Sequence, residues 1–196
     1  GSLTPVDPKT GKPGKPVAVD DPYNMYFSPD GKSAIVVAEA MKRLDFRDPK
    51  TMQLQYSIEV PKCAGINHAD FSIDGRYAIF TCEFSGTVAK IDLVERKVLG
   101  YLQLILPGKP TKVVKGPDGR DETICTTWKG MPQDIRVSPD GKTWYIADMM
   151  SNGVYVVDGE RFAQIDYVKP STGAHGLYPS RDGRKLYVAN RGSNVI

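Results

Sequence analysis

The sequence predicts an all-β protein of the β-propeller class. One turn signature, Ser-x-Asp-Gly, occurs four times, and its aspartates are Asp30, Asp74, Asp140 and Asp182. These aspartates are 44, 66 and 42 residues apart. The first and last spacings match the roughly 40–45 residues of a four-stranded propeller blade. Because no segment shows a convincing helical pattern, a strand-only repeat of this length favours a propeller over a sandwich.

Four strands are expected in each repeat, and the innermost one precedes the turn. Short runs rich in β-branched and aromatic residues follow the turn, which predicts second strands at 33–38, 77–81, 143–147 and 185–189. Third strands are expected at 43–45, 87–92 and 154–158, and fourth strands at 54–60, 98–104 and 163–168. The repeated aspartates are then structural, because Ser-Pro-Asp-Gly is a turn sequence in which Asp bonds back to the backbone and Gly accepts positive φ.

These units predict a single propeller over residues 3–196, with blade equivalents at about 20–60, 64–106, 131–169, and 172–196 combined with 3–19. Three blades are then complete, and a fourth is split between the termini, which closes a ring without a free edge. Two alternatives remain open: the chain is part of a seven- or eight-bladed protein, or two copies form a homodimer that completes a larger ring. Residues 1–2, Gly-Ser, are typical of a scar left by tag removal.

Residues 105–130 form an insertion between the second and third blades. The segment is polar, basic and rich in turn residues, so we expect a loop or β-hairpin with a turn at Gly116–Gly119. Insertions of this length are commonly functional. It is therefore predicted to be part of a partner surface.

Composition and motifs exclude several classes of function. The net charge of +3, without a basic run, argues against nucleic-acid binding, and no apolar stretch is long enough to span a membrane. Cys63, Cys82 and Cys125 contain no C-x-x-C pair, which argues against structural zinc, and three free thiols are favoured over a disulfide framework. No nucleophile elbow, phosphate loop or H-E-x-x-H motif supports hydrolase or nucleotide chemistry.

The repeat resembles the YVTN-type β-propeller repeats over nearly the whole chain. The segments that carry this resemblance include FSPDGKSAIVVAEA and VSPDGKTWYIADMMSNGVYVVD, together with Tyr187-Val-Ala-Asn190 and its altered form Tyr145-Ile-Ala-Asp148. The resemblance implies a secreted or periplasmic bacterial protein, most often a binding scaffold. The same broad group resembles lactonases, the haem-bearing propeller of nitrite reductases and copper propellers such as nitrous oxide reductase.

Four polar residues near the starts of the innermost strands are the candidate ligand-binding residues. His68 precedes Asp74 by six residues and His175 precedes Asp182 by seven, and the corresponding residues elsewhere are Asn24 and Asp134. Since innermost strands line the channel of a propeller, these side chains are expected to converge at the channel mouth. His68 and His175 are also candidate copper or zinc ligands, and either one alone could serve as the axial ligand of a haem. Plain lining of the channel is the favoured interpretation.

Other side chains offer weaker candidates. Met131, Met149 and Met150 could ligate Cu(I), although packing is the favoured role, and Arg136 and Arg191 could contact an anionic ligand. The sequence thus predicts an exported bacterial scaffold that binds a small-molecule ligand or protein partner rather than an enzyme. The alternatives are a copper or haem protein that uses the histidines, and a lactonase-like hydrolase whose channel residues hold a divalent cation.

Overall fold

The structure is a computed structural model that describes residues 1–116 and 119–196; two residues of the turn expected at 116–119 lie outside this range. The described residues form eighteen strands and no helix. Three sheets have four antiparallel strands in the order of the sequence. Blade 1 is β3 (Pro22–Phe27), β4 (Ala34–Ala38), β5 (Arg43–Arg47) and β6 (Leu54–Glu59). Blade 2 is β7 (Ile66–Phe71), β8 (Tyr77–Cys82), β9 (Thr87–Asp92) and β10 (Lys97–Gln103), and blade 3 is β13 (Pro132–Val137), β14 (Thr143–Asp148), β15 (Gly153–Asp158) and β16 (Ala163–Val168).

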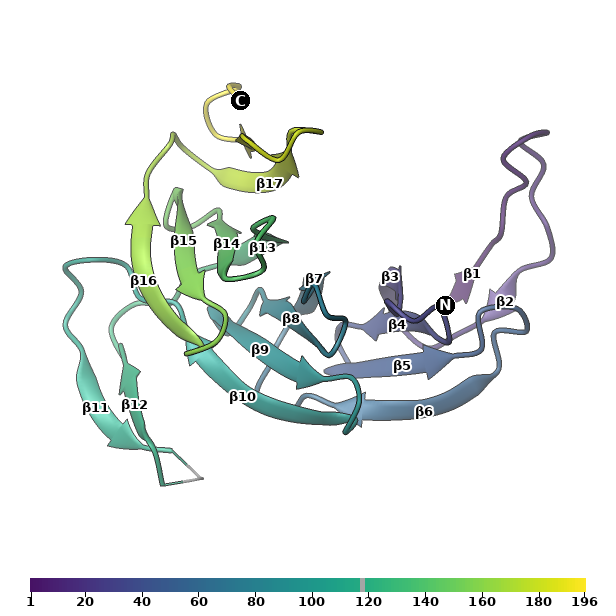
Figure 1. Ribbon diagram of the computed structural model, residues 1–196, viewed down its shortest axis with the longest axis horizontal. Coiled ribbons are helices and arrows are strands. Elements are labelled where there is room, and N and C mark those ends of the chain that lie inside the picture. Colours follow the sequence, from purple (N-terminus) through teal and green to yellow (C-terminus); the bar gives the residue numbers. More distant parts are fainter. Residues whose placement is uncertain (117–118) are drawn as a thin grey trace.

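The blades are arranged as an open arc (Figure 1). The first strands of the three blades, β3, β7 and β13, lie on its concave side, and the fourth strands, β6, β10 and β16, lie on its convex side. Two two-stranded sheets occupy the ends: β1 (Ser2–Leu3) with β2 (Val17–Ala18), and β17 (Ala174–Pro179) with β18 (Leu186–Asn190). No ladder joins these two sheets in the described part of the chain. The sheets are therefore not closed into a ring.

The N-terminal hairpin has the turn that joins the third and fourth strands of a blade. Residues 7–11, Asp-Pro-Lys-Thr-Gly, repeat the pattern of residues 48–52, Asp-Pro-Lys-Thr-Met. In both turns the fifth residue has positive φ and donates its N–H to the carbonyl of the aspartate at 2.8 Å. Asp92 and Asp158 begin similar turns in blades 2 and 3, where each accepts two backbone N–H bonds.

The Ser-x-Asp-Gly turns are built alike in all four repeats. In each turn the serine hydroxyl donates to the aspartate carboxylate at 2.6–2.7 Å, and the glycine has a φ of +69° to +75°. Neighbouring turns also lie close together. A Cβ atom at Gly75, Gly141 or Gly183 would come within 2.9–3.0 Å of a side chain of the preceding turn, which is Pro29, Ile73 or Pro139 respectively. The four aspartates thus act as turn residues, as the sequence predicts.

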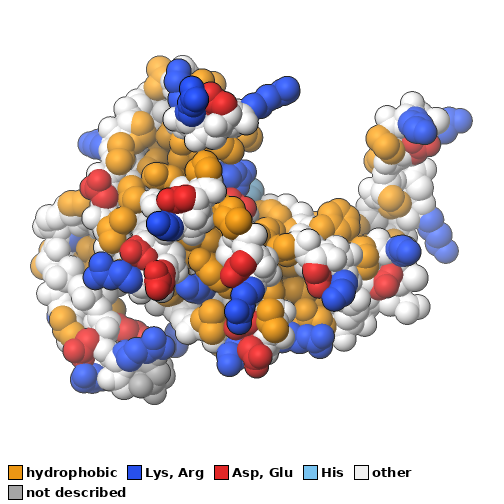
Figure 2. Space-filling view, viewed as in Figure 1, with side chains coloured by type: hydrophobic (Ala, Val, Ile, Leu, Met, Phe, Trp, Pro, Cys, Tyr) orange, Lys and Arg blue, Asp and Glu red, His pale blue; other side chains and the backbone are white. Residues whose placement is uncertain are grey.

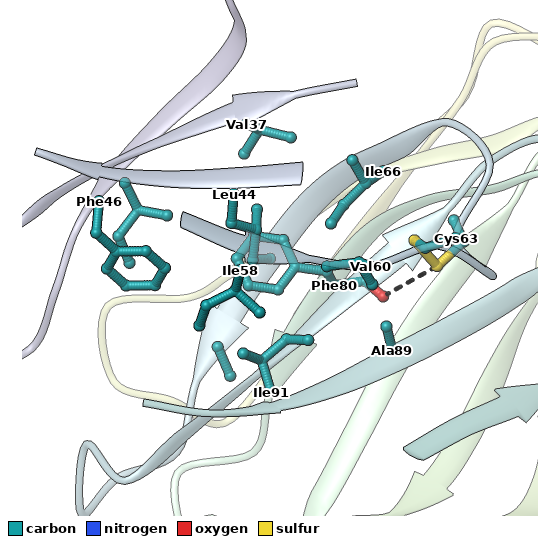
Figure 3. Close-up of a cluster of buried hydrophobic side chains, with 14 residues drawn as sticks. Val37, Leu44, Phe46, Ile58, Val60, Cys63, Ile66, Phe80, Ala89 and Ile91 are labelled. Atoms are coloured by element: carbon teal, nitrogen blue, oxygen red, sulfur yellow. Dashed lines mark hydrogen bonds between the residues drawn. A yellow bond between two sulfur atoms is a disulfide. The ribbon is translucent and has the colours of Figure 1, made fainter. Parts of the chain in front are cut away.

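Three apolar clusters hold the blades together. One joins blades 1 and 2 and contains Leu44, Phe46 and Phe80 (Figure 3). A second joins blades 2 and 3 around Trp144 and Tyr155, and a smaller one joins blade 3 to β17. Neighbouring blades, and blade 3 with β17, therefore bury apolar side chains between them, as expected of a repeat protein.

The prediction of three free thiols was wrong for two of the cysteines. Cys63 and Cys82 form a disulfide (Figure 3) with a Cα–Cα distance of 4.9 Å. Cys125 is free and buried. Cys82 ends β8 and pairs in register with Ile66 on β7, three residues after Cys63. The hairpin of the blade therefore brings together two thiols that are 19 residues apart in sequence.

The insertion forms a β-hairpin of β11 (Lys112–Lys115) and β12 (Asp121–Ile124) that projects from the convex side of the arc (Figure 1). Two glutamines fasten its base. The Gln103 amide exchanges two hydrogen bonds with the backbone of Cys125, and the Gln164 amide exchanges two with the backbone of Ile105. No helix in the described residues is long and apolar enough to cross a membrane.

Candidate functional site

Every innermost strand carries a β-bulge near its start. The pairing register shifts between Pro22 and Asn24 in β3, and between Ile66 and Ala69 in β7. The corresponding shifts lie between 132 and 135 in β13 and between 174 and 176 in β17. His68, Asp134 and His175 lie within these bulges, and Asn24 follows one directly. Because a bulge changes the direction in which a side chain points, the candidate residues stand at the irregular point of each strand.

His68 is held by two residues of blade 1. The Asn24 amide nitrogen lies 3.2 Å from Nδ1 of His68 and 3.0 Å from the Tyr26 hydroxyl, and that hydroxyl lies 3.4 Å from the same Nδ1. The Met25 N–H donates to Oδ1 of Asn24 at 2.8 Å, which fixes the amide orientation. Nδ1 of His68 therefore accepts, and the proton of the neutral ring is on Nε2. No protein acceptor for Nε2 is found in the described part of the chain.

Both histidines favour the neutral form. Burial lowers the pKa of His68, and the charge of Asp134 opposes this shift only in part. Burial also lowers the pKa of His175, with the nearby positive charge of Arg191 as the next cause. At neutral pH both rings therefore carry one donor and one acceptor nitrogen, the state in which imidazole binds a polar ligand or a metal.

Asp134 is occupied by structural bonds. Its Oδ1 accepts from the backbone N–H of Ile135 at 2.9 Å and from Nη1 of Arg136 at 2.8 Å. Its Oδ2 accepts from the N–H of Leu177 on β17 at 2.9 Å. The carboxylate thus links blade 3 to the last sheet. Asp70, which the sequence analysis did not single out, links blade 2 to blade 3 in the same manner through the N–H of Val137.

The four candidates lie near one another. Asn24 contacts His68 directly, the negative charge of Asp134 acts on both His68 and His175, and a positive charge on His175, when it is protonated, lowers the pKa of His68. Figure 2 shows a histidine at the concave margin of the arc, beside basic and acidic side chains. We call this region the inner-wall site and define it as Asn24, Tyr26, His68, Asp134, Arg136 and His175.

Tyr26 did not stand out in the sequence, because aromatic residues are common in β-strands. Its hydroxyl accepts from the N–H of Ala69 at 3.0 Å and so belongs to the polar network between blades 1 and 2. The signal that could have found it is its spacing, two residues after Asn24, which places both side chains on one face of the strand.

The donor set does not fit a copper cluster or a divalent cation. Among the described residues, no three His, Cys, Asp or Glu side chains are grouped closely enough to hold a metal ion. His68 and His175 therefore lack a third protein ligand of these types, and the carboxylate nearest them is used by Arg136 and two backbone N–H groups. Met150 is exposed, and the backbone N–H of Met149 bonds the carbonyl of Met131.

Comparisons with known proteins give the fold. Neither a protein-family model nor a curated protein matches the sequence. The periplasmic gluconolactonase of Pseudomonas aeruginosa is 19% identical, with a TM-score of 0.73 over 98% of this chain and 56% of its own. Hydrazine synthase of Kuenenia stuttgartiensis is 20% identical, with a TM-score of 0.68 over 90% of this chain and 44% of its own.

A third structure is the Cps50 (Swd1) β-propeller domain of Myceliophteria thermophila, which is 14% identical with a TM-score of 0.52 over 89% of this chain and 64% of that domain. The chain thus spans about half the length of the gluconolactonase and hydrazine synthase chains. Since three sheets of four antiparallel strands form one arc and the similar structures are propellers, the chain has the β-propeller fold.

Proposed function

We propose that this protein is an exported propeller scaffold that binds a small polar ligand at the inner-wall site. The observation that carries this proposal is the neutral His68, whose Nδ1 is fixed by Asn24 and Tyr26 while its Nε2–H has no protein acceptor in the described chain. A half-buried donor of this kind gains from a ligand oxygen that accepts its hydrogen bond. The positive charges of Arg136 and Arg191 near the histidines are opposed by the negative charges of Asp134 and Glu83, and Arg136 is paired with Asp134 at 2.8 Å. The site therefore favours a strongly polar ligand.

Export is supported by the disulfide between Cys63 and Cys82, since such bonds persist mainly in oxidising compartments. The similar gluconolactonase is named as periplasmic, which agrees with this location. The split fourth blade is supported by the turn at Asp7–Gly11, which repeats the turn between third and fourth strands. Completion of the ring by a longer chain or by a second copy remains compatible with the open arc.

Lactone hydrolysis is the second candidate. The similar structure named as a gluconolactonase motivates this candidate, and the neutral imidazole of His68 could accept a proton from an attacking water once Nδ1 is released from Asn24 or the ring changes tautomer. No divalent cation is invoked, because the required group of donors is not found among the described residues.

The test uses the fact that the chain has only 2 histidines. Their imidazole NMR signals are followed while gluconate, and then glucono-lactone, is added to the wild type and to His68→Gln. Arg184→Gln, a substitution in the last Ser-x-Asp-Gly turn, is the control. Binding that shifts the His68 signal and is lost in His68→Gln supports the scaffold. Lactone turnover that is lost in the same variant and survives a chelator supports the hydrolase. Absence of both effects overturns the proposal for sugar acids and their lactones.

A further inference from the structure

A cavity of about 670 Å³ lies between blades 1 and 2, beside their Ser-x-Asp-Gly turns and away from the inner-wall site. Its volume is in the range of small-molecule sites. The buried ring of Phe46 and the half-buried ring of Tyr56 line it from blade 1, and Arg96 lines it from blade 2. Lys32 and Arg76 from the two turns complete the set of cationic side chains around it.

The cavity arises from differences between repeats. Ser33 stands three residues after its turn aspartate, where blade 2 has Tyr77. At the interface between blades 2 and 3, the Tyr77 ring lies 5.7 Å from that of Trp144 and beneath the Lys90 ammonium, which donates to the carbonyl of Gly159. The corresponding region there is filled by protein groups. The small Ser33 leaves it open between blades 1 and 2.

Two aromatic rings of the cavity are stacked, and the guanidinium group of Arg96 lies over one of them. We call the two stacked rings the platform. The rings of Phe46 and Tyr56 are stacked, with centroids 4.5 Å apart and an interplanar angle of 13°. The guanidinium carbon of Arg96 lies 4.2 Å from the centroid of Tyr56. The interface between blades 2 and 3 has different residues at these three positions. Lys90 replaces Phe46, Gly100 replaces Tyr56 and Phe162 replaces Arg96. The stacked platform is thus particular to this cavity.

The arginine side chains at the cavity have N–H donors that are free to bind a ligand, whereas the two carboxylates there already accept hydrogen bonds from their own turns. Asp30 and Asp74 each accept from a serine hydroxyl and a backbone N–H of their own turns, and these bonds lower the pKa of both carboxyls. Lys32 reaches Asp30 at 3.5 Å. Neither Arg76 nor Arg96 has a carboxylate within ion-pair distance among the described residues, so their guanidinium groups can bind a carboxylate or phosphate.

We propose that this cavity binds a small organic anion with a flat ring, whose charged group contacts Arg96 and Arg76 and whose ring packs against the exposed part of Tyr56. Phe46, which is only 1% exposed, supports the Tyr56 ring from behind, and a carboxylate or phosphate matches the two-pronged donors of guanidinium. The ammonium of Lys32 supplies a further donor at the same cavity, whereas the Ser33 hydroxyl donates to Oε1 of Gln55 at 2.6 Å.

Benzoate is the probe, titrated into the labelled full chain and followed by NMR shifts of the backbone amides at the cavity. Arg96→Gln removes the cation, and Ser33→Tyr fills the cavity with the side chain that the next blade carries at this position. The matched control is Arg184→Gln, because Arg184 and Arg76 both stand two residues after a turn aspartate, and Arg184 lies outside the cavity. Urea unfolding confirms that each variant is folded.

We expect saturable binding to the wild type and to Arg184→Gln, and at least about tenfold weaker binding to Arg96→Gln and Ser33→Tyr. Inorganic phosphate, which lacks the ring, and benzyl alcohol, which lacks the charge, are expected to bind more weakly than benzoate. If Ser33→Tyr does not fold, Arg96→Gln decides alone. Absence of benzoate binding, equal binding by Arg96→Gln and the wild type, or equal binding of benzyl alcohol overturns the proposal.

Discussion

At the scale of single residues, the neighbouring turns show why Gly follows Asp in each repeat. Gly75 has a φ of +69°, and a Cβ there would lie 2.9 Å from Cβ of Pro29 in the preceding turn. Gly31 has nearly the same φ, +70°, but no atom lies within 4 Å of its would-be Cβ. Gly75 is required because its φ is positive and because a Cβ atom would clash with Pro29. Gly31 is required only because its φ is positive.

We therefore predict that Gly75→Ala lowers the free energy of unfolding more than Gly31→Ala does. The left-handed conformation costs alanine about 1–2 kcal/mol at both positions. The contact with Pro29 adds on the order of 1 kcal/mol at Gly75 only. Urea unfolding of both variants measures the difference. Equal losses would show that the contact with Pro29 adds no cost at Gly75.

The lowered pKa of His68 gives a second prediction at this scale. Between its folded-state pKa and the ordinary value near 6.5, the unfolded chain binds more protons at this site than the folded chain does, so stability rises with pH. The contribution of His68 is fully present above the ordinary pKa and is lost as pH falls through the folded-state pKa. His68→Gln should make the free energy of unfolding less dependent on pH below neutrality. An unchanged pH profile in urea titrations would contradict the burial of a neutral ring.

At the scale of elements, a repeated contact in blade 2, blade 3 and the last sheet ties the loop before the first strand to the turn after the second strand. The N–H of Glu83 donates to the carbonyl of Gly65, that of Met149 to Met131 and that of Arg191 to Gly173. The residue that ends the second strand reinforces this contact. In blade 3, Asp148 accepts from the N–H of Met131 at 2.9 Å, and in blade 2, Cys82 forms the disulfide with Cys63. The disulfide of blade 2 therefore occupies the position of the Asp148 hydrogen bond in blade 3.

Removing that bond should destabilise the protein by about 3 kcal/mol, because the crosslink closes a loop of roughly 20 residues in the unfolded chain. The suitable variant is Cys63→Ala with Cys82→Ala, since it leaves no half-paired thiol. Urea unfolding of this variant is compared with that of Cys125→Ala, which leaves the disulfide intact. Equal stability of the double variant and the wild type under oxidising conditions would mean that the crosslink is absent or contributes nothing.

At the scale of the whole molecule, each blade of the arc contacts only the blades next to it. A central blade has two neighbours and an end sheet has one, so the ends are expected to be less stable than the centre. Blade 2 packs against blades on both sides, through clusters that include Phe80 and Ile79. The sheet of β17 and β18 contributes only Ala174 and Leu177 to the buried cluster it shares with blade 3. Tyr178 and Tyr187 are paired on this last sheet and are exposed by 63% and 46%.

Native-state hydrogen exchange should therefore be slowest in β8, β9, β14 and β15 and fastest in β1, β2, β17 and β18. The end strands open without disrupting the central blades, because they have few buried apolar contacts. Mass spectrometry of peptides after exchange measures this order. Protection of β18 equal to that of β14 would contradict the open arc and favour closure of the fourth blade by β1 and β2, or by a second copy.

The sequence alone determined the repeat, its turns and the class of fold, because Ser-x-Asp-Gly turns and β-branched runs are local signals whose physics lies within a few residues. It also placed Asn24 and His68 correctly at the starts of innermost strands, because a fixed repeat carries position from one blade to the next. Only the tertiary structure showed the partnership of Cys63 with Cys82, the use of Asp134 as a link between blades and the cavity beside Tyr56. Each of these depends on which side chains face one another across hairpins or blades, and that packing is absent from any single repeat.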